Sequence, residues 1–253
     1  DLFIANFESS IMPDSELASA SMERSIYTAP ESALSLFSTI DPIIVLNVAN
    51  NHFSQHGYES VEYSISTMEN YGIKCIGKNR HPETIYLHDR RILCWGINLV
   101  KTMHDNSLCS IDDPLCLLES LEWPRKDNDD LWIISVHWGS EYLSLPDQWQ
   151  ISLSQKLLDK GIDIIYGHHP HVLQPIEIFS KGTVFFSQGN FLFDQNFSRR
   201  TQRGLLSTIH TQTNRLKLYY TSQSDYRVCI HNDTTPDAVL QHCKRNYSKL
   251  IPF

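Results

Sequence analysis

The sequence predicts an α/β fold with stacked β-sheets, and three observations support this fold class. Apolar strand-like runs alternate with helix-like segments from residue 1 to residue 167. After about residue 172 the pattern changes to a succession of short strands. No linker, repeat or low-complexity tract divides the 253 residues, a length that can bury one large core. We therefore expect residues 1–253 to form a single domain with a β-rich C-terminal part.

Two strands and one helix are predicted before residue 50. The run DLFIANF at residues 1–7 is apolar on both faces, which indicates a buried strand. A helix is expected to begin at residues 28–31, because Pro30 suits a first helical turn and apolar residues follow at helical spacing. These apolar residues are Leu34, Phe37 and Ile40. The run PIIVLNV at residues 42–48 is typical of a strand inside a parallel sheet.

A helix and three strands are predicted between residues 58 and 100. Apolar Val61, Ile65 and Met68 recur at a period of about 3.6 residues, which indicates a helix over Tyr58–Tyr71. Gly72 suits the position after its last turn. Residues 73–77 return as a strand, and residues 83–100 predict a hairpin that turns at Asp89-Arg90.

The remaining elements begin with strand, helix and strand. LWIISVHW at 131–138 predicts a buried strand, 146–160 a helix and 162–167 the next strand. Four short strands and a C-terminal helix are expected after that. The strands are 175–179, 183–187, 204–211 and 215–222, and the helix is 236–250.

The composition excludes several classes of function. A formal net charge of −8 argues against nucleic acid as the main partner, because phosphate binding favours a basic surface. No apolar stretch is long enough to span a membrane, and residues 1–4 do not begin a signal peptide. The six cysteines match no zinc-binding spacing. Because they are scattered along the chain, we expect them to be reduced thiols, which indicates a cytoplasmic protein.

Polar residues follow four of the predicted strands. In open α/β sheets ligands bind beyond the carboxyl ends of the strands, so residues that are far apart in the sequence are expected to meet at one site. The four clusters are Asn6 and Glu8; Asn50, Asn51 and His52; His137; and His168, His169 and His171.

Each cluster also has an interpretation without a function. Glu8 alone suits a solvated loop, Asn50-Asn51-His52 suits a turn, and His137 alone suits a satisfied core histidine. The segment GHHPH is harder to explain in this way. If it is extended, His169 and His171 face the same side. A carboxylate, an amide and three imidazoles at strand ends together predict a site for two divalent cations.

The ordered motifs NFE, NNH, HWG, GHHPH and SQGNF resemble the capsule-synthesis family typified by the CapA and PgsA poly-γ-glutamate proteins. The resemblance covers residues 1 to about 200 and extends to the calcineurin-like metallophosphoesterase superfamily. It implies a four-layer α-β-β-α sandwich with a dinuclear site for Mn, Fe or Zn at the strand ends.

The resemblance also implies a role for each motif residue. It implies metal ligands at Glu8, Asn51, His137, His169 and His171, and a catalytic histidine at His52. His168 receives no role. Glu141 and Asn190 match family positions that support the ligands from outside.

Two departures from the family pattern stand out. The superfamily's first motif, an aspartate ligand on an N-terminal strand, is absent, so the chain begins at the second motif. Gln55 stands where the family usually has an acid after NNH, which removes a charge near His52.

Two functions follow from these observations. The first is metal-assisted hydrolysis of a phosphoester on an anionic small molecule or polymer, in a capsule or poly-γ-glutamate pathway. The second is a non-hydrolytic accessory subunit for synthesis or export of an anionic polymer, favoured by the missing motif and Gln55. A plain α/β domain with scattered histidines is a third interpretation. An upstream membrane anchor, if one has been removed, would change the expected location to extracellular.

Overall fold

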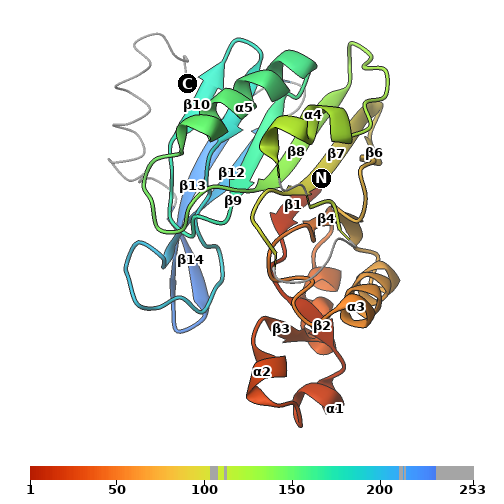
Figure 1. Ribbon diagram of the computed structural model, residues 1–253, viewed down its shortest axis with the longest axis vertical. Helices are drawn as coiled ribbons and strands as arrows, with labels where there is room; N and C mark the ends of the chain where they lie inside the picture. Colours follow the sequence, from red (N-terminus) through yellow and green to blue (C-terminus); the bar gives the residue numbers. More distant parts are fainter. Residues whose placement is uncertain (103–107, 111–112, 211–212, 214, 232–253) are drawn as a thin grey trace. The chain divides into compact units, whose positions relative to one another are not determined.

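The protein is described by a computed structural model in which residues 1–102, 108–110, 113–210, 213 and 215–231 are placed (Figure 1). Its internal contacts divide the chain into two compact units. Unit 1 contains Asp1–His137 and Asp159–Asp163, and unit 2 contains Trp138–Leu158 and Ile164–Phe253. The predicted helix 236–250 lies outside the described residues. Both units mix helices and strands, which confirms the α/β class, while the four-layer sandwich and the single domain stay predictions.

A three-stranded parallel sheet opens unit 1, in the order β1–β4–β5. The strands are β1 (Leu2–Asn6), β4 (Ile43–Asn47) and β5 (Lys74–Ile76). All three were predicted. Asn6 pairs with Asn47, so β1 and β4 end at the same edge of the sheet. The residues that follow these two strands are therefore brought together.

Helix α3 (Tyr58–Asn70) packs against β5 and against β2 (Ser10–Met12) (Figure 1). Its Val61 and Met68 are buried in one apolar cluster, as the helical period predicts. Gly72 has a φ of 77°, and its N–H donates to the Glu69 carbonyl at 2.9 Å. A left-handed residue at this position ends a helix and satisfies its last carbonyls. The predicted helix end is confirmed.

The second group of strands in unit 1 is β6 (Glu83–Leu87), β7 (Arg90–Asn98) and β8 (Leu131–His137). Strands β6 and β7 form the predicted antiparallel hairpin, with the turn at His88–Asp89, one residue earlier than expected. Strand β8 pairs with β7 in parallel, and all seven of its residues are buried. Its last residue is His137.

The helix predicted to begin at residues 28–31 is present from Glu31 onward, as a 3₁₀ helix. Residues Thr28–Pro30 form the short strand β3, which pairs with β2, and Glu31–Thr39 form the 3₁₀ helix η1. The hydroxyls of Ser35, Ser38 and Thr39 each donate to the carbonyl three residues earlier at 2.7 Å. Bonds at this spacing suit the tighter helix, and apolar periodicity alone does not reveal them.

Several short elements were not predicted, because each is too short to show a period. They are β2, β3, α1 (Asp14–Leu17), α2 (Met22–Ser25), η2 (Pro114–Cys116), α4 (Leu117–Ser120) and β14 (Arg227–His231).

Unit 2 contains strands in the order β10–β11–β9 and an antiparallel sheet in the order β12–β13–β14. The predicted helix appears as α5 (Gln148–Lys160), two residues later than expected, and its last two residues count with unit 1. The strands are β9 (Ile164–His168), β10 (Ile176–Phe179), β11 (Gly182–Phe185), β12 (Arg203–His210) and β13 (Arg215–Ser224). The β-rich end is thereby confirmed as far as residue 231.

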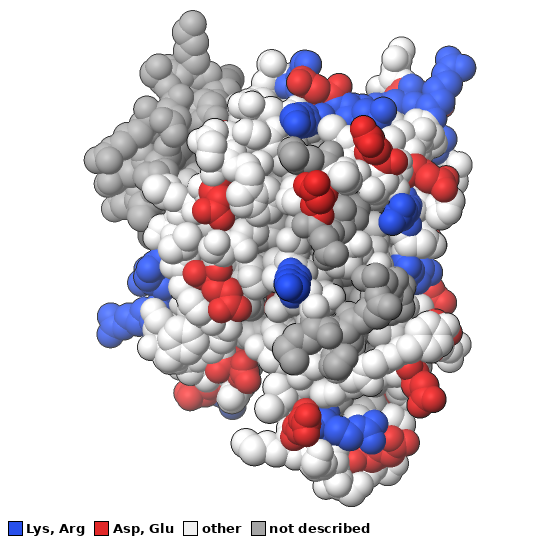
Figure 2. Space-filling model, in the orientation of Figure 1, with Lys and Arg blue, Asp and Glu red and all other residues white. Residues whose placement is uncertain are grey.

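The described residues carry mixed surface charges and unbridged cysteines. Basic and acidic side chains are interspersed on the face in Figure 2. Among the placed residues, no helix is both long and apolar enough to span a membrane. The five placed cysteines form no disulfide, and burial raises the pKa of Cys75 to about 12 and that of Cys109 to about 11. Thiols with such pKa values stay protonated and unreactive at neutral pH.

Candidate functional site

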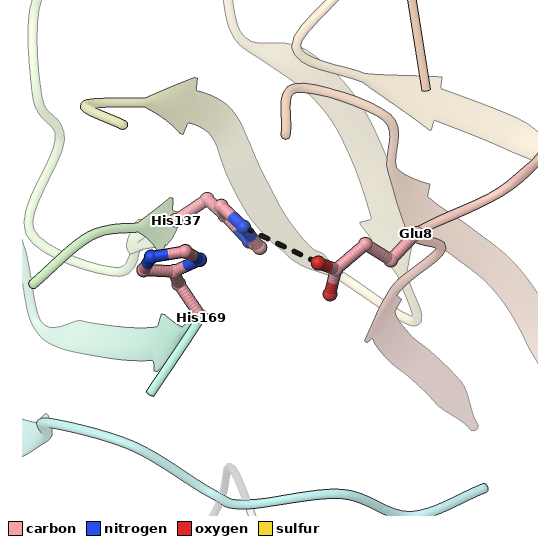
Figure 3. Close-up of side chains that lie close together, drawn as sticks. All are labelled: Glu8, His137 and His169. Atoms are coloured by element: carbon pink, nitrogen blue, oxygen red, sulfur yellow. Dashed lines mark ion pairs between the residues drawn. The ribbon is translucent and has the colours of Figure 1, made fainter. Parts of the chain in front are cut away.

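Glu8, just beyond β1, directs its carboxylate at His137, the last residue of β8 (Figure 3). The Glu8 Oε1 atom lies 3.6 Å from His137 Nε2, and the two side chains are 8% and 0% exposed. Asn6 Nδ2 donates to the other carboxylate oxygen at 3.2 Å. A carboxylate this buried is stable only where donors or cations face it, and the imidazole and the amide are two such groups.

The side chain of Asn50 shapes the loop after β4. Its oxygen accepts the backbone N–H groups of His52 at 3.1 Å and of Phe53 at 2.8 Å. Its Nδ2 donates to the Phe7 carbonyl at 2.9 Å, which ties the loop to the residue beside Glu8. The turn interpretation of the motif therefore holds for Asn50, and the two residues after it reach different partners, Asn51 contacting His137 and His52 facing Glu8.

Asn51 completes a set of three converging donor atoms. Its Oδ1 accepts a hydrogen bond from His137 Nε2 at 2.7 Å, and the same nitrogen faces Glu8. A cation that replaced the proton on this nitrogen would meet an imidazole, an amide oxygen and a carboxylate. This donor set suits Mn, Fe or Zn, so the residues of unit 1 fit the implied metal.

His52 lies beside this set and is held on two sides. Its Nε2 is 3.9 Å from Glu8 Oε1, and its Nδ1 donates to Gln55 Oε1 at 2.9 Å. Gln55 thus supports the ring without the negative charge that an acid would bring. The ring of Tyr27 stacks on the imidazole with the centroids 3.5 Å apart and the planes 12° apart. Tyr27 was not predicted from the sequence, since it belongs to none of the motifs.

Unit 2 brings together His169, His171 and Glu141. Their ligand atoms lie within 4.8 Å of one another, and the two imidazole centroids are 5.9 Å apart. Both histidines are buried, whereas Glu141 is exposed. Asn190 is 7% exposed, and its oxygen accepts from His171 Nδ1 at 3.0 Å, a contact of the kind that orients a histidine ring. Asn190 thus contacts a predicted ligand, and the Glu141 carboxylate lies beside both predicted histidine ligands.

The expectation of an extended GHHPH segment is wrong. Strand β9 ends at His168, and the next two histidines have φ values of 97° and 56°. Positive φ is costly for residues with a side chain, so the surroundings must hold it. One such restraint is the Tyr142 N–H, which donates to the Pro170 carbonyl at 2.8 Å. His169 and His171 therefore converge through a sharp turn and not through strand alternation.

His168 differs from its two neighbours. Its carbonyl accepts the Trp138 N–H at 3.0 Å, and burial lowers its pKa to about 4. An imidazole with this pKa is neutral at physiological pH.

The comparison with known families identifies the chain. The family described as "Bacterial capsule synthesis protein PGA_cap" matches residues 1–107 and 113–195. The chain belongs to this family. The resemblance expected from the motifs is confirmed, and the matched ranges include every candidate residue described above.

Several relatives of the chain have names that refer to the synthesis of a capsule or polymer. It is 30% identical to "Capsule biosynthesis protein CapA" of Bacillus anthracis over 184 residues, which are 67% of this chain and 44% of that protein. It is 27% identical to "PGA biosynthesis protein CapA" of Bacillus subtilis over 225 residues, 85% of this chain and 58% of that protein. A "Probable polyglutamine synthesis accessory protein" of Mycobacterium tuberculosis is 22% identical over 215 residues, covering 77% of this chain and 56% of that protein. The chain thus spans about half the length of these relatives.

Proposed function

We propose that this chain is a metal-dependent hydrolase that acts on a phosphoester during synthesis of a capsule or poly-γ-glutamate-type polymer. The observation that carries the proposal is the convergence of Glu8, Asn51 and His137 beside His52. The pathway is taken from the family and from the names of the relatives. The substrate is expected to be anionic.

The proposed ligands form one group in each unit. Glu8, Asn51 and His137 of unit 1 would hold a divalent cation, and His169 and His171 of unit 2 are the proposed ligands of a second. Glu141 is a further candidate, because its carboxylate lies among the two imidazoles. Two such cations would supply a nucleophile at neutral pH and offset the charge of the phosphoryl group.

The proposed role of His52 is proton transfer. With Nδ1 donating to Gln55, Nε2 is the atom that can hold a proton for the leaving oxygen. Glu8 on the Nε2 side restricts where that edge of the ring can point.

Metal loading is the direct test of the proposal. After loading with Mn²⁺ or Zn²⁺ and removal of free metal, elemental analysis should find bound metal in the parent chain. The substitution Glu8→Gln should lower this content. His81→Ala is the matched control, because His81 is exposed and pairs with Glu122 at 2.8 Å, away from the predicted ligands. Manganese should then switch on hydrolysis of an aryl phosphate. A parent chain without metal would refute the proposal.

A second candidate function is a non-hydrolytic accessory role in polymer synthesis or export. It is favoured by the neutral Gln55 and by the word "accessory" in the name of the mycobacterial relative. The two functions differ in turnover. If the accessory function is correct, the chain would bind metal and hydrolyse no phosphoester when loaded with it.

A further inference from the structure

The ring of Tyr27 covers one face of the His52 imidazole. The centroid distance of 3.5 Å and the angle of 12° describe a close, nearly parallel stack. Aromatic pairs in such contact have preferred relative positions and contribute beyond the area that they bury. The stack therefore restricts the tilt of the imidazole, which a hydrogen bond at one edge does not.

Tyr27 is anchored by the backbone around it. Its carbonyl accepts the Ser10 N–H at 2.9 Å and the Ser10 hydroxyl at 3.3 Å, and Ser10 is fully buried at the start of β2. The next residue, Thr28, pairs with Ser10 in the β2–β3 ladder. Tyr27 itself has a φ of 54°, a conformation that is uncommon for a bulky residue. Such a conformation persists only where neighbouring structure imposes it.

A second link joins this segment to the loop that carries His52. His56 Nε2 donates to the carbonyl of Ile26 at 2.9 Å. The residue before Tyr27 is thus tied to the residue that follows Gln55. The segment that carries Tyr27 and the loop that carries His52 are thus joined by a hydrogen bond as well as by the stacked rings.

We propose that Tyr27 is a positioning residue for His52. Gln55 fixes the Nδ1 edge of the imidazole, Tyr27 fixes its plane, and Nε2 is consequently kept beside Glu8. The position of the His52 ring against Tyr27 does not depend on the reaction that the chain catalyses. Its chemical consequence, efficient proton delivery by His52, rests on the proposed function. Displacing a reacting group by about 1 Å can cost as much as 10²-fold in rate.

The test compares Tyr27→Leu with Tyr27→Phe in the full chain. Leucine removes the aromatic face and keeps apolar bulk, whereas phenylalanine keeps the ring. Tyr86→Leu is the matched control, since Tyr86 is 68% exposed on β6. Thermal melting of each variant shows whether it is folded.

The first readout is the NMR spectrum of a chain labelled with ¹³C-histidine, with the His52 signal assigned by its loss in His52→Gln. The shielding that a stacked ring exerts should disappear in Tyr27→Leu, so the His52 ring protons move downfield. They should stay in place in Tyr27→Phe and Tyr86→Leu. An unmoved signal in folded Tyr27→Leu would overturn the inference, whatever the activity of the chain.

The second readout is turnover on two phosphoesters. Tyr27→Leu should lower kcat about 10-fold or more for an alkyl ester, whose leaving oxygen needs a proton, and much less for a nitrophenyl ester. Tyr27→Phe should hydrolyse the alkyl ester at the rate of the parent chain. A shifted His52 signal with unchanged turnover would overturn the positioning role. A parent chain without any turnover would instead refute the proposed function and leave the NMR result to decide the geometry.

Discussion

Asn51 and His52 are adjacent in the chain, yet their side chains contact different groups. Asn51 Oδ1 accepts from His137, whereas His52 is held by Gln55 and faces Glu8. The substitution His52→Ala should therefore keep the metal content and lower phosphoester turnover by about 10²–10⁴-fold, the usual effect of a lost acid–base group. Asn51→Ala should lose metal and turnover together. Elemental analysis and steady-state kinetics measure both, and loss of metal in His52→Ala would contradict the assignment.

His169 and His171 allow a similar comparison at the end of β9. Changing either to Ala should weaken metal binding about 10–100-fold, on the scale seen for altered metal shells. Asn190→Ala should act in the same direction, because its oxygen orients His171. His168→Ala is the control, since His168 is given no role at the metal. Titration of metal-free protein with Zn²⁺ measures the affinities, and equal losses in all the variants would contradict the distinction.

The residues of the candidate site were predictable where a polar side chain lies at or just beyond the end of a strand. Glu8 and His137 stand just beyond β1 and at the end of β8, so the rule for strand ends was enough to pair them. Tyr27 was not predictable, because its stack depends on a left-handed backbone conformation and on a contact 25 residues along the chain, which no local pattern encodes. The position of Glu141 beside both His169 and His171 was not predicted, since the turn at these histidines could not be foreseen.

At the scale of elements, long apolar runs identified β4, α3 and β8, whereas the short elements β2, β3, α1 and α2 were not predicted. Strands and helices with a buried face repeat a period, and the sequence displays it. The short parallel pair β2–β3 depends on Ser10, whose hydroxyl and N–H bond to distant backbone. Such pairing follows tertiary contacts that periodicity cannot reveal.

Gly96 in β7 lies where other segments of unit 1 approach the strand closely. A Cβ atom at this position would lie 2.3 Å from Asn47 Oδ1 and 2.7 Å from the Gly77 nitrogen. Asn47 is fully buried, and its side chain shapes the backbone leading to the NNH motif by accepting the Ala49 N–H at 3.0 Å. Gly96→Ala should therefore destabilise the fold by about 1–3 kcal/mol, the usual cost of overpacking.

Gly72→Ala is the matched control for this prediction. A Cβ there meets no atom within 4 Å, and only its φ of 77° opposes the change. The cost should be about 1 kcal/mol, the penalty of a left-handed residue with a side chain. Urea unfolding gives both values. A Gly96→Ala chain as stable as the parent would show that Asn47 and β7 do not pack so closely.

At the scale of the whole molecule, one ion pair makes stability depend on pH. Arg91 donates to both carboxylate oxygens of Asp130, at 2.9 and 2.6 Å, and thereby lowers the pKa of this buried carboxyl. A lowered pKa contributes stability above the ordinary aspartate value, about 3.9, and this contribution is lost as the pH falls through the folded value. Asp130→Asn should lower the urea midpoint at pH 7, and the difference from the parent should shrink below about pH 4. A difference independent of pH would exclude this linkage.

Metal binding should couple the site to the stability of the folded chain. The proposed ligands Glu8, Asn51 and His137 come from β1, the loop after β4 and β8, so a cation held by them binds the folded form and not the unfolded one. Free metal at about 100 times its dissociation constant then adds about 2.7 kcal/mol to the free energy of unfolding. Manganese or zinc should raise the Tm of the parent chain, and a chelator should reverse the rise. In Glu8→Gln the rise should be smaller, whereas His81→Ala should respond like the parent. An equal rise in Glu8→Gln would show that the metal binds elsewhere.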